Sequence, residues 1–153
     1  PTLNDVLNDS RMIPLNIELK ISPATDLERL AERVISEVNG NIACTPPMIS
    51  SFNLEILQNL RESSESIKLG YLFAQEDWER SMLFETITEN NFQAVHPHHS
   101  LVSEEFMNAS KEDNIEVNVW TVNEQRLVKR LIDLGVNAII TDDVPMVKAF
   151  IKG

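Results

Sequence analysis

The sequence of 153 residues has little cysteine, glycine or positive charge. Its single cysteine, Cys44, excludes an internal disulfide, and we expect a small buried or half-buried side chain there. The 13 Lys and Arg residues against 24 Asp and Glu give a formal net charge of −11. A chain this acidic lacks the basic surface that binds nucleic acid or an anionic membrane, so we expect neither partner.

Long apolar runs and glycine-rich loops are also missing. No apolar run approaches the ~20 residues of a membrane-spanning helix. With four glycines in total, no predicted strand is followed by a glycine-rich phosphate loop, which disfavours a nucleotide-binding sheet. The chain begins at Pro1 and not at Met, so we expect the natural N-terminus upstream. We predict a cytoplasmic protein and leave a periplasmic or secreted one open, because a signal peptide would lie upstream.

Strands and helices are predicted to alternate along the whole chain. Short apolar or alternating runs predict six strands, at residues 14–21, 48–52, 67–73, 92–96, 115–122 and 138–141. Helical periodicity predicts helices before, between and after them, with Thr2, Asn53, Ser103 and Asn123 as N-caps and Gly135 as a helix end. A further helix is expected at residues 76–88, and one at 145–150 after Asp142 and Asp143.

This pattern predicts an α/β protein in which residues 1–153 form a single domain. Each strand–helix unit takes roughly 20 to 33 residues, the size of a βα unit, and the last strands are apolar on both faces, as buried parallel strands are. Two architectures fit: an open doubly wound sheet, or an incomplete (β/α)₈ TIM-type barrel with about six parallel βα units. A complete barrel takes about 250 residues, so this chain would be roughly two strands short.

The first predicted strand carries the most informative polar residues. Leu15, Ile17 and Leu19 alternate with Glu18 and Lys20, so the acid and the base lie on one face, about 7 Å apart along the chain. This arrangement suits a shared polar site, in which the carboxylate holds a cation and the ammonium group holds an anion. The alternative is an ordinary strand with a surface ion pair.

Other polar and aromatic residues fall at predicted strand ends, where the function of a βα-barrel is found. Phe52, His96, Trp120 and Asp142 are in such positions. For His96 and the two histidines after Pro97 we favour a surface loop over a metal cluster. For Asp142 and Asp143 we favour helix capping over metal binding.

Five segments resemble successive motifs of the glycerophosphodiester phosphodiesterase family. They are residues 15–20 (LNIELK), 50–52 (SSF), 95–97 (VHP), 119–123 (VWTVN) and 139–143 (IITDD), in the order of the family. The family fold is a (β/α)₈ barrel. The resemblance implies that Glu18 binds a divalent cation, Ca²⁺ or Mg²⁺, and that Lys20 faces the substrate phosphate. It also implies that Phe52 and Trp120 line the mouth of the site; for Trp120 an aromatic core position is the alternative.

The family pattern also contains His-Arg-Gly, Glu-x-Asp and His-Asp motifs, and none of them occurs in residues 1–153. The resemblance therefore implies a C-terminal three-quarters of such an enzyme, without the histidine pair that performs acid–base catalysis, so we expect no catalytic residue in this chain. The parent would hydrolyse glycerophosphodiesters to glycerol 3-phosphate and an alcohol. We expect the chain alone to be inactive.

The resemblance and the predicted edges also imply partners. The expected partners are a small-molecule glycerophosphodiester, the missing N-terminal segment of the same barrel, and further copies of the chain at its open strand edges. The alternative function is a non-catalytic, barrel-derived module that uses its acidic surface for protein contacts.

Overall fold

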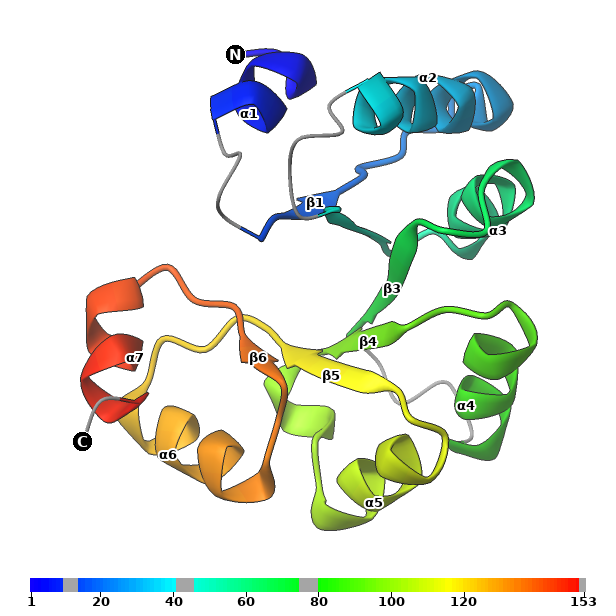
Figure 1. Cartoon of the computed structure of the whole chain (residues 1–153). Coiled ribbons are helices and arrows are strands. Elements are labelled where there is room, and N and C mark those ends of the chain that lie inside the picture. The colour runs from blue at the N-terminus through cyan, green and yellow to red at the C-terminus, as the bar shows by residue number, and fades with distance from the viewer. Residues whose placement is uncertain (10–13, 41–45, 75–79, 152–153) are drawn as a thin grey trace. The chain divides into compact units, whose positions relative to one another are not determined.

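The computed structural model describes residues 1–9, 14–40, 46–74 and 80–151 (Figure 1). Cys44 and the predicted start of a helix at residues 76–79 lie outside these ranges. The chain consists of two compact units, residues 1–71 and 72–153, and each is described by itself. That residues 1–153 form a single domain stays a prediction.

The first unit consists of parallel strands that alternate with helices. Its elements are α1 (Leu3–Asp9), β1 (Asn16–Glu18), α2 (Leu27–Gly40), β2 (Met48–Ser51), α3 (Leu54–Ser63) and most of β3 (Lys68–Phe73). Strand β2 pairs with β1 and β3 in parallel, and Glu18 lies opposite Ser50 in this register. Helices α2 and α3 pack against each other. Parallel neighbours joined by helices are the arrangement that βα units produce.

Local signals explain where the helices of the first unit begin. Thr2 and Asp5 form a reciprocal cap, in which each backbone N–H donates to the other side chain, at 2.8 and 3.2 Å. The side chain of Asn53 accepts a hydrogen bond from the Ile56 N–H at 2.9 Å and caps α3. Helix α3 buries Ile56, Leu57 and Leu60, which follow the helical period. The predicted caps at Thr2 and Asn53 are confirmed.

The second unit repeats the same pattern. After the end of β3 it contains α4 (Arg80–Glu89), β4 (Ala94–Pro97), the 3₁₀ turn η1 (His99–Leu101), α5 (Glu104–Glu112), β5 (Glu116–Val119), α6 (Gln125–Leu134), β6 (Ala138–Ile139) and α7 (Val144–Ile151). Strand β5 pairs in parallel with β4 and β6. Val95, Val117 and Val119 are fully buried, and the rings of Phe73 and Phe84 flank Phe106 at centroid distances of 6.3 and 5.2 Å.

Several element ends differ from the predictions. The strands are shorter than the apolar runs, because β5 ends at Val119 and β6 at Ile139. Strand β4 includes Pro97, whereas the predicted strand ended at residue 96. Proline has no N–H to donate, but its carbonyl still accepts from the Trp120 N–H at 3.2 Å. Gly135 adopts φ +80° and ends α6, which confirms that prediction.

Two strands have one paired neighbour each. Among the described residues, β1 pairs with β2 alone and β6 with β5 alone. Close to β6 in the sequence, α7 exposes Val144, Phe150 and Ile151. Exposed strand edges favour pairing with another chain. Self-association through these edges stays a prediction.

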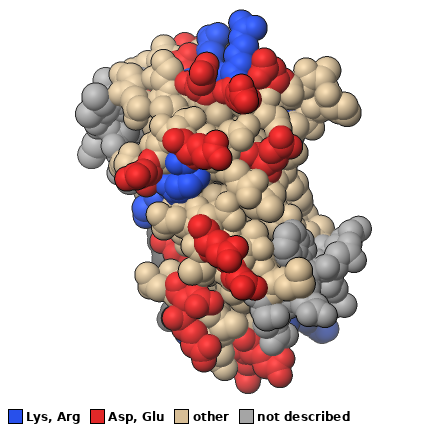
Figure 2. Space-filling view, turned by 90° about the vertical axis from the view of Figure 1, so that its right-hand side faces the viewer, with Lys and Arg blue, Asp and Glu red and all other residues tan. Residues whose placement is uncertain are grey.

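Acidic side chains cover much of the face shown in Figure 2, where Lys and Arg occur in fewer places. Exposed glutamates on the helices include Glu28 and Glu32 of α2 and Glu104, Glu105 and Glu112 of α5. Charges spread along exposed helix faces keep a protein soluble and do not by themselves define a site.

Candidate functional site

A pocket of about 660 Å³ opens in the first unit beyond the C-terminal ends of β1 and β2. It is lined by Glu18, Leu19, Lys20, Ile21, Ser22, Pro23, Thr25, Leu27, Ser51, Phe52 and Asn53. Three of the four residues that the sequence predicts for the site, Glu18, Lys20 and Phe52, therefore line one pocket. The pocket combines both charges, several hydroxyl groups and apolar side chains, a mixture typical of small-molecule sites.

Glu18 and Lys20 form an ion pair at the end of β1. The Lys20 Nζ lies 3.0 Å from the Glu18 Oε1, with the two side chains 83% and 32% exposed respectively. The alternation that the sequence predicts is present, because Leu15, Ile17 and Leu19 are half-buried while Glu18 and Lys20 are exposed. A pair this exposed contributes between about 0 and 1 kcal/mol to stability. Both side chains are therefore available to a ligand at small cost to the fold.

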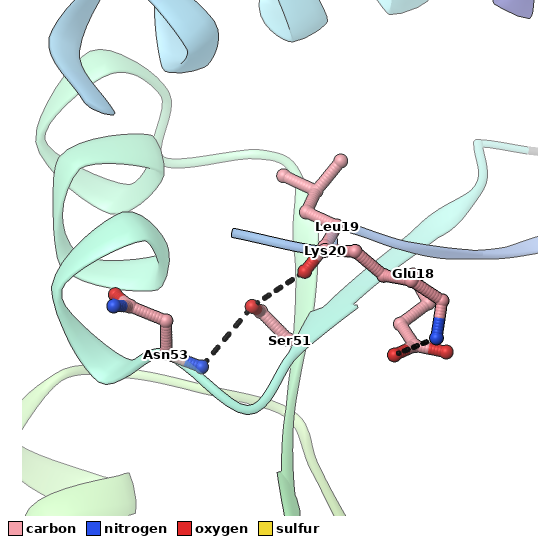
Figure 3. A network of polar contacts seen from close by, with 5 residues as sticks. All are labelled: Glu18, Leu19, Lys20, Ser51 and Asn53. Carbon is pink, nitrogen blue, oxygen red and sulfur yellow. Dashed lines mark hydrogen bonds and ion pairs between the residues drawn. The ribbon is translucent and has the colours of Figure 1, made fainter. Parts of the chain in front are cut away.

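Ser51 links the strand that carries this pair to the next loop (Figure 3). Its Oγ donates to the carbonyl of Leu19 at 2.8 Å and accepts from the Asn53 N–H at 3.1 Å. The side chain is buried, with 1% of Ser51 exposed. Sequence reasoning placed Ser51 at a strand end but gave it no role. A serine two residues before a helix-capping asparagine was the available signal.

Phe52 lies between these two anchored residues and is 47% exposed. A phenylalanine exposed to this extent loses about half of the benefit that burial gives an aromatic ring. Because it lines the pocket, its ring offers an apolar wall beside the Glu18–Lys20 pair. Phe52 therefore contributes an exposed apolar side chain to the pocket.

Trp120 follows β5 in the second unit. Its indole Nε1 donates to the His96 carbonyl at 2.7 Å, and its ring meets the His98 ring edge-on at a centroid distance of 5.5 Å. The side chain is half-buried. Trp120 is thus fixed at the C-terminal end of its strand, as predicted, by a polar contact on one side and an aromatic contact on another.

The histidine segment is not the surface loop that the sequence predicted. His96 is fully buried in β4, and the rings of His98 and His99, in and beside η1, are tilted at a centroid distance of 4.1 Å. Asn118 Nδ2 lies 3.2 Å from His96 Nε2. An amide NH₂ group only donates, so this contact fits a neutral ring that accepts at Nε2. Burial lowers the pKa of His96 from 6.5 to about 4.

We predict that this histidine makes the fold sensitive to acid. Between pH 6.5 and about 4, His96 is protonated in the unfolded chain but not in the folded one, so the free energy of unfolding falls as the pH falls. Each pH unit between the two pKa values corresponds to about 1.4 kcal/mol, so the loss from His96 is at most roughly 3 kcal/mol. Urea unfolding at a series of pH values measures this slope.

A direct measurement accompanies the unfolding series. The NMR titration of the His96 ring should give a pKa of about 4, well below 6.5, and His96→Leu should flatten the slope. An ordinary pKa for His96 would show that it is solvated and that the prediction is wrong.

Asn123 joins the loop between β5 and α6 to the loop between β6 and α7. The Asn123 Nδ2 donates to Asp142 Oδ2 at 2.8 Å, and its Oδ1 accepts from Thr141 Oγ1 and from the Asp142 N–H. The prediction that Asn123 caps α6 is therefore wrong: its side chain is engaged across the sheet, and Glu124 is the N-cap without a side-chain hydrogen bond. Asp143 caps α7 through the Met146 N–H at 3.0 Å, which confirms capping for this residue.

Glu18 is the carboxylate that fits a cation in the first pocket. Its oxygens suit Ca²⁺ or Mg²⁺, but these ions require several oxygen ligands. Within the described ranges, no three Asp, Glu, His or Cys side chains come together as a metal site. Glu18 therefore has the chemistry of a single carboxylate ligand and belongs to no such group of three among the described residues.

Solved structures resemble the chain along its whole length. A protein from Silicibacter pomeroyi matches 99% of this chain with a TM-score of 0.89 at 22% identity, over 56% of its own length. A phosphodiesterase from Oleispira antarctica, solved with the product sn-glycerol-3-phosphate, matches all of this chain with a TM-score of 0.83 at 21% identity, over 62% of its own length. With its six parallel βα units, the chain is an α/β protein with the fold of an incomplete (β/α)₈ barrel, as predicted.

Sequence comparison gives the family. The model of the glycerophosphoryl diester phosphodiesterase family matches residues 1–146. A glycerophosphodiester phosphodiesterase from Caldanaerobacter subterraneus subsp. tengcongensis is 27% identical over 148 residues, which cover 94% of this chain and 58% of that protein. The chain belongs to the glycerophosphoryl diester phosphodiesterase family. It spans about half the length of the curated relatives it matches.

The described helices were also checked for membrane spans. Not one of them has both the length and the apolar character needed to cross a bilayer.

Proposed function

We propose that the chain contributes the substrate-binding and part of the cation-binding side of an enzyme that hydrolyses glycerophosphodiesters to glycerol 3-phosphate and an alcohol. The observation that carries this proposal is the contact between Glu18 and Lys20 in the pocket at the end of β1. Membership in the family supports it, since its named relatives are phosphodiesterases. The ligand of the Oleispira antarctica structure supports glycerol 3-phosphate as the bound product.

Three residues of the pocket have a proposed role. Glu18 provides one oxygen ligand to a divalent cation, Ca²⁺ or Mg²⁺, and this cation offsets the negative charge of the phosphate when it is bound. Lys20 has three N–H donors on a largely exposed side chain, so it can exchange its contact with Glu18 for one with a phosphate oxygen. Phe52 covers the apolar side of the alcohol. For Trp120, a role at the mouth of the site stays a prediction from the resemblance.

Proton transfer requires groups that these residues do not offer. The Lys20 side chain is 83% exposed, whereas lysines that transfer protons are typically buried. His96 is buried and hydrogen-bonded to Asn118, with a pKa of about 4, so it does not act as an acid near neutral pH. We therefore propose that the acid–base pair comes from polypeptide outside residues 1–153, as the missing His-Arg-Gly and His-Asp motifs imply.

Binding of the product tests the pocket without requiring turnover. We predict that sn-glycerol 3-phosphate binds to the chain, and that Lys20→Met weakens binding by about tenfold or more, because a charge-assisted hydrogen bond contributes about 1.5–3 kcal/mol. Broadening of the ³¹P NMR signal of the ligand on titration with protein measures the affinity.

Lys129→Met is the matched control. Lys129 pairs with Asp133 at 2.9 Å, is 70% exposed and does not line the pocket. Equal losses of affinity in the Lys20 and Lys129 variants would mean that the ligand is attracted by the overall charge of the protein and not by Lys20 itself. Absence of binding by the unmodified chain would favour the alternative of a protein-interaction module.

A further inference from the structure

We infer that Ser51 is a positioning residue, whose buried hydroxyl fixes the main chain between Glu18 and Lys20 and thereby the place of both charged side chains in the pocket. The role of the two charged side chains in binding a ligand rests on the proposed function. The inference about Ser51 itself rests on hydrogen bonds, burial and strand length.

The Ser51 hydroxyl makes two contacts that match its chemistry. It donates its one hydrogen to the Leu19 carbonyl and accepts from the Asn53 N–H, at 2.8 and 3.1 Å. A hydroxyl has one donor and two acceptor positions, so both contacts can exist together. Because Ser51 is 1% exposed, water does not readily replace either contact.

The first contact is needed because β1 is short. The strand has three residues and ends at Glu18, so Lys20 lies beyond its ladder. The Leu19 N–H still donates to the Ser50 carbonyl at 2.8 Å, and the Leu19 carbonyl then receives the Ser51 hydroxyl. These two hydrogen bonds hold Leu19 at its N–H and at its carbonyl. Glu18 and Lys20, its two neighbours, are thereby placed by the main chain.

The second contact ties this strand end to a helix that is held by the core. The side chain of Asn53 caps α3 through the Ile56 N–H, while its own N–H is held by Ser51. Ile56 and Leu57 are fully buried, so the first turn of α3 is a fixed point of the unit. The hydroxyl connects this fixed point to Leu19, as Figure 3 shows. Phe52 lies between two anchored residues and is held by the same bonds.

The charged pair does not position itself. Lys20 is 83% exposed, and the entropy of its flexible side chain opposes any single placement. The location of the ammonium group is therefore limited chiefly by the position of the Lys20 main chain. The Ser51 hydroxyl fixes that position by holding Leu19, the neighbouring residue. Its role differs from that of Glu18 and Lys20, because the Ser51 hydroxyl donates its one hydrogen to the main chain of the protein.

The test compares Ser51→Ala and Ser51→Thr with a matched control. Ser110→Ala removes a hydroxyl that is equally buried and also donates to a backbone carbonyl, that of Met107 at 2.9 Å, but in α5 of the other unit. Amide hydrogen exchange at Leu19 and Asn53 is the first measurement. We expect Ser51→Ala to accelerate it by about tenfold relative to Ser110→Ala, as the loss of a buried hydrogen bond implies, and Ser51→Thr to restore it.

Affinity for sn-glycerol 3-phosphate is the second measurement. We expect Ser51→Ala to weaken binding by about tenfold, near the effect of removing one supporting hydrogen bond, and Ser110→Ala to leave it unchanged. If the alanine variant does not fold, Ser51→Cys, which has a similar size and a weak donor, replaces it.

The two measurements separate two failures. If the unmodified chain does not bind the ligand, the proposed function fails, while hydrogen exchange still decides whether Ser51 fixes Leu19. Exchange at Leu19 and Asn53 that is equal in the Ser51→Ala and Ser110→Ala variants would overturn the inference. If the unmodified chain binds the ligand and the Ser51→Ala variant binds it with the same affinity, the inference is also overturned.

Discussion

The 153-residue chain alone should release no measurable glycerol 3-phosphate from glycerophosphocholine or glycerophosphoethanolamine, with Ca²⁺ or Mg²⁺ present. Glu18 is a single carboxylate, and neither Lys20 nor His96 is suited to proton transfer at neutral pH. General acid–base catalysis typically contributes 10²- to 10⁴-fold, so its absence alone would reduce turnover below detection. The assay requires protein whose mass confirms this chain and no longer form.

Coexpression with a second polypeptide should restore activity by orders of magnitude. That polypeptide is an N-terminal segment of a family member that carries the His-Arg-Gly, Glu-x-Asp and His-Asp motifs. It would add both histidines and two carboxylates, and it would give the strand edges of β1 and β6 partners. The matched control is the same segment with its first histidine changed to alanine, which should assemble without activity.

One result would contradict this view directly. Turnover by the chain alone that Glu18→Ala abolishes would mean that the acid–base groups lie within residues 1–153. The proposed division of roles between the two polypeptides would then be wrong.

The second large effect is expected from Glu18→Gln in the reconstituted pair. This change removes the charge of the proposed cation ligand and keeps its size, so turnover should fall by at least about 100-fold, since even residues that only support a metal ligand cost 10- to 100-fold. The melting temperature should change little, because the exposed Glu18–Lys20 pair contributes at most about 1 kcal/mol. Initial rates across a cation titration, together with thermal melts, measure both.

Asp133→Asn provides the control for Glu18→Gln. Asp133 pairs with Lys129 at 2.9 Å on α6, so its change removes a comparable ion pair outside the pocket. Normal turnover of the Glu18→Gln variant at low cation concentration would exclude Glu18 as a ligand. A large loss of melting temperature would mean that the residue serves the fold.

The sequence predicted the features that depend on local pattern. Alternation of apolar and polar residues placed Glu18 and Lys20 on one face of a strand, and helical periodicity with a capping residue located α3 behind Asn53. These signals lie within one element or its first turn, where side-chain period and capping chemistry act directly. The parallel βα units were predicted in the same way, from the alternation and the spacing of strands and helices.

What the sequence did not predict depends on contacts between elements. The burial of His96 requires β5 with Asn118 beside it, and the engagement of Asn123 requires the end of β6. The link between Ser51 and Leu19 joins residues 32 positions apart. In each case a polar side chain has a plausible local role, as a loop residue or a cap, and the tertiary hydrogen bond replaces it.

The weak contribution of the Glu18–Lys20 pair to stability has a consequence for how such a sequence drifts. Most substitutions that disappear from a population do so because they reduce the folded fraction, and exposed positions are largely spared by this filter. If folding were all that mattered, the two codons would randomise early, while those for Ile49 or Leu57 would stay fixed by packing. Descendants of this gene that had lost every use for the pocket would therefore keep their barrel strands long after the acid and the base had gone.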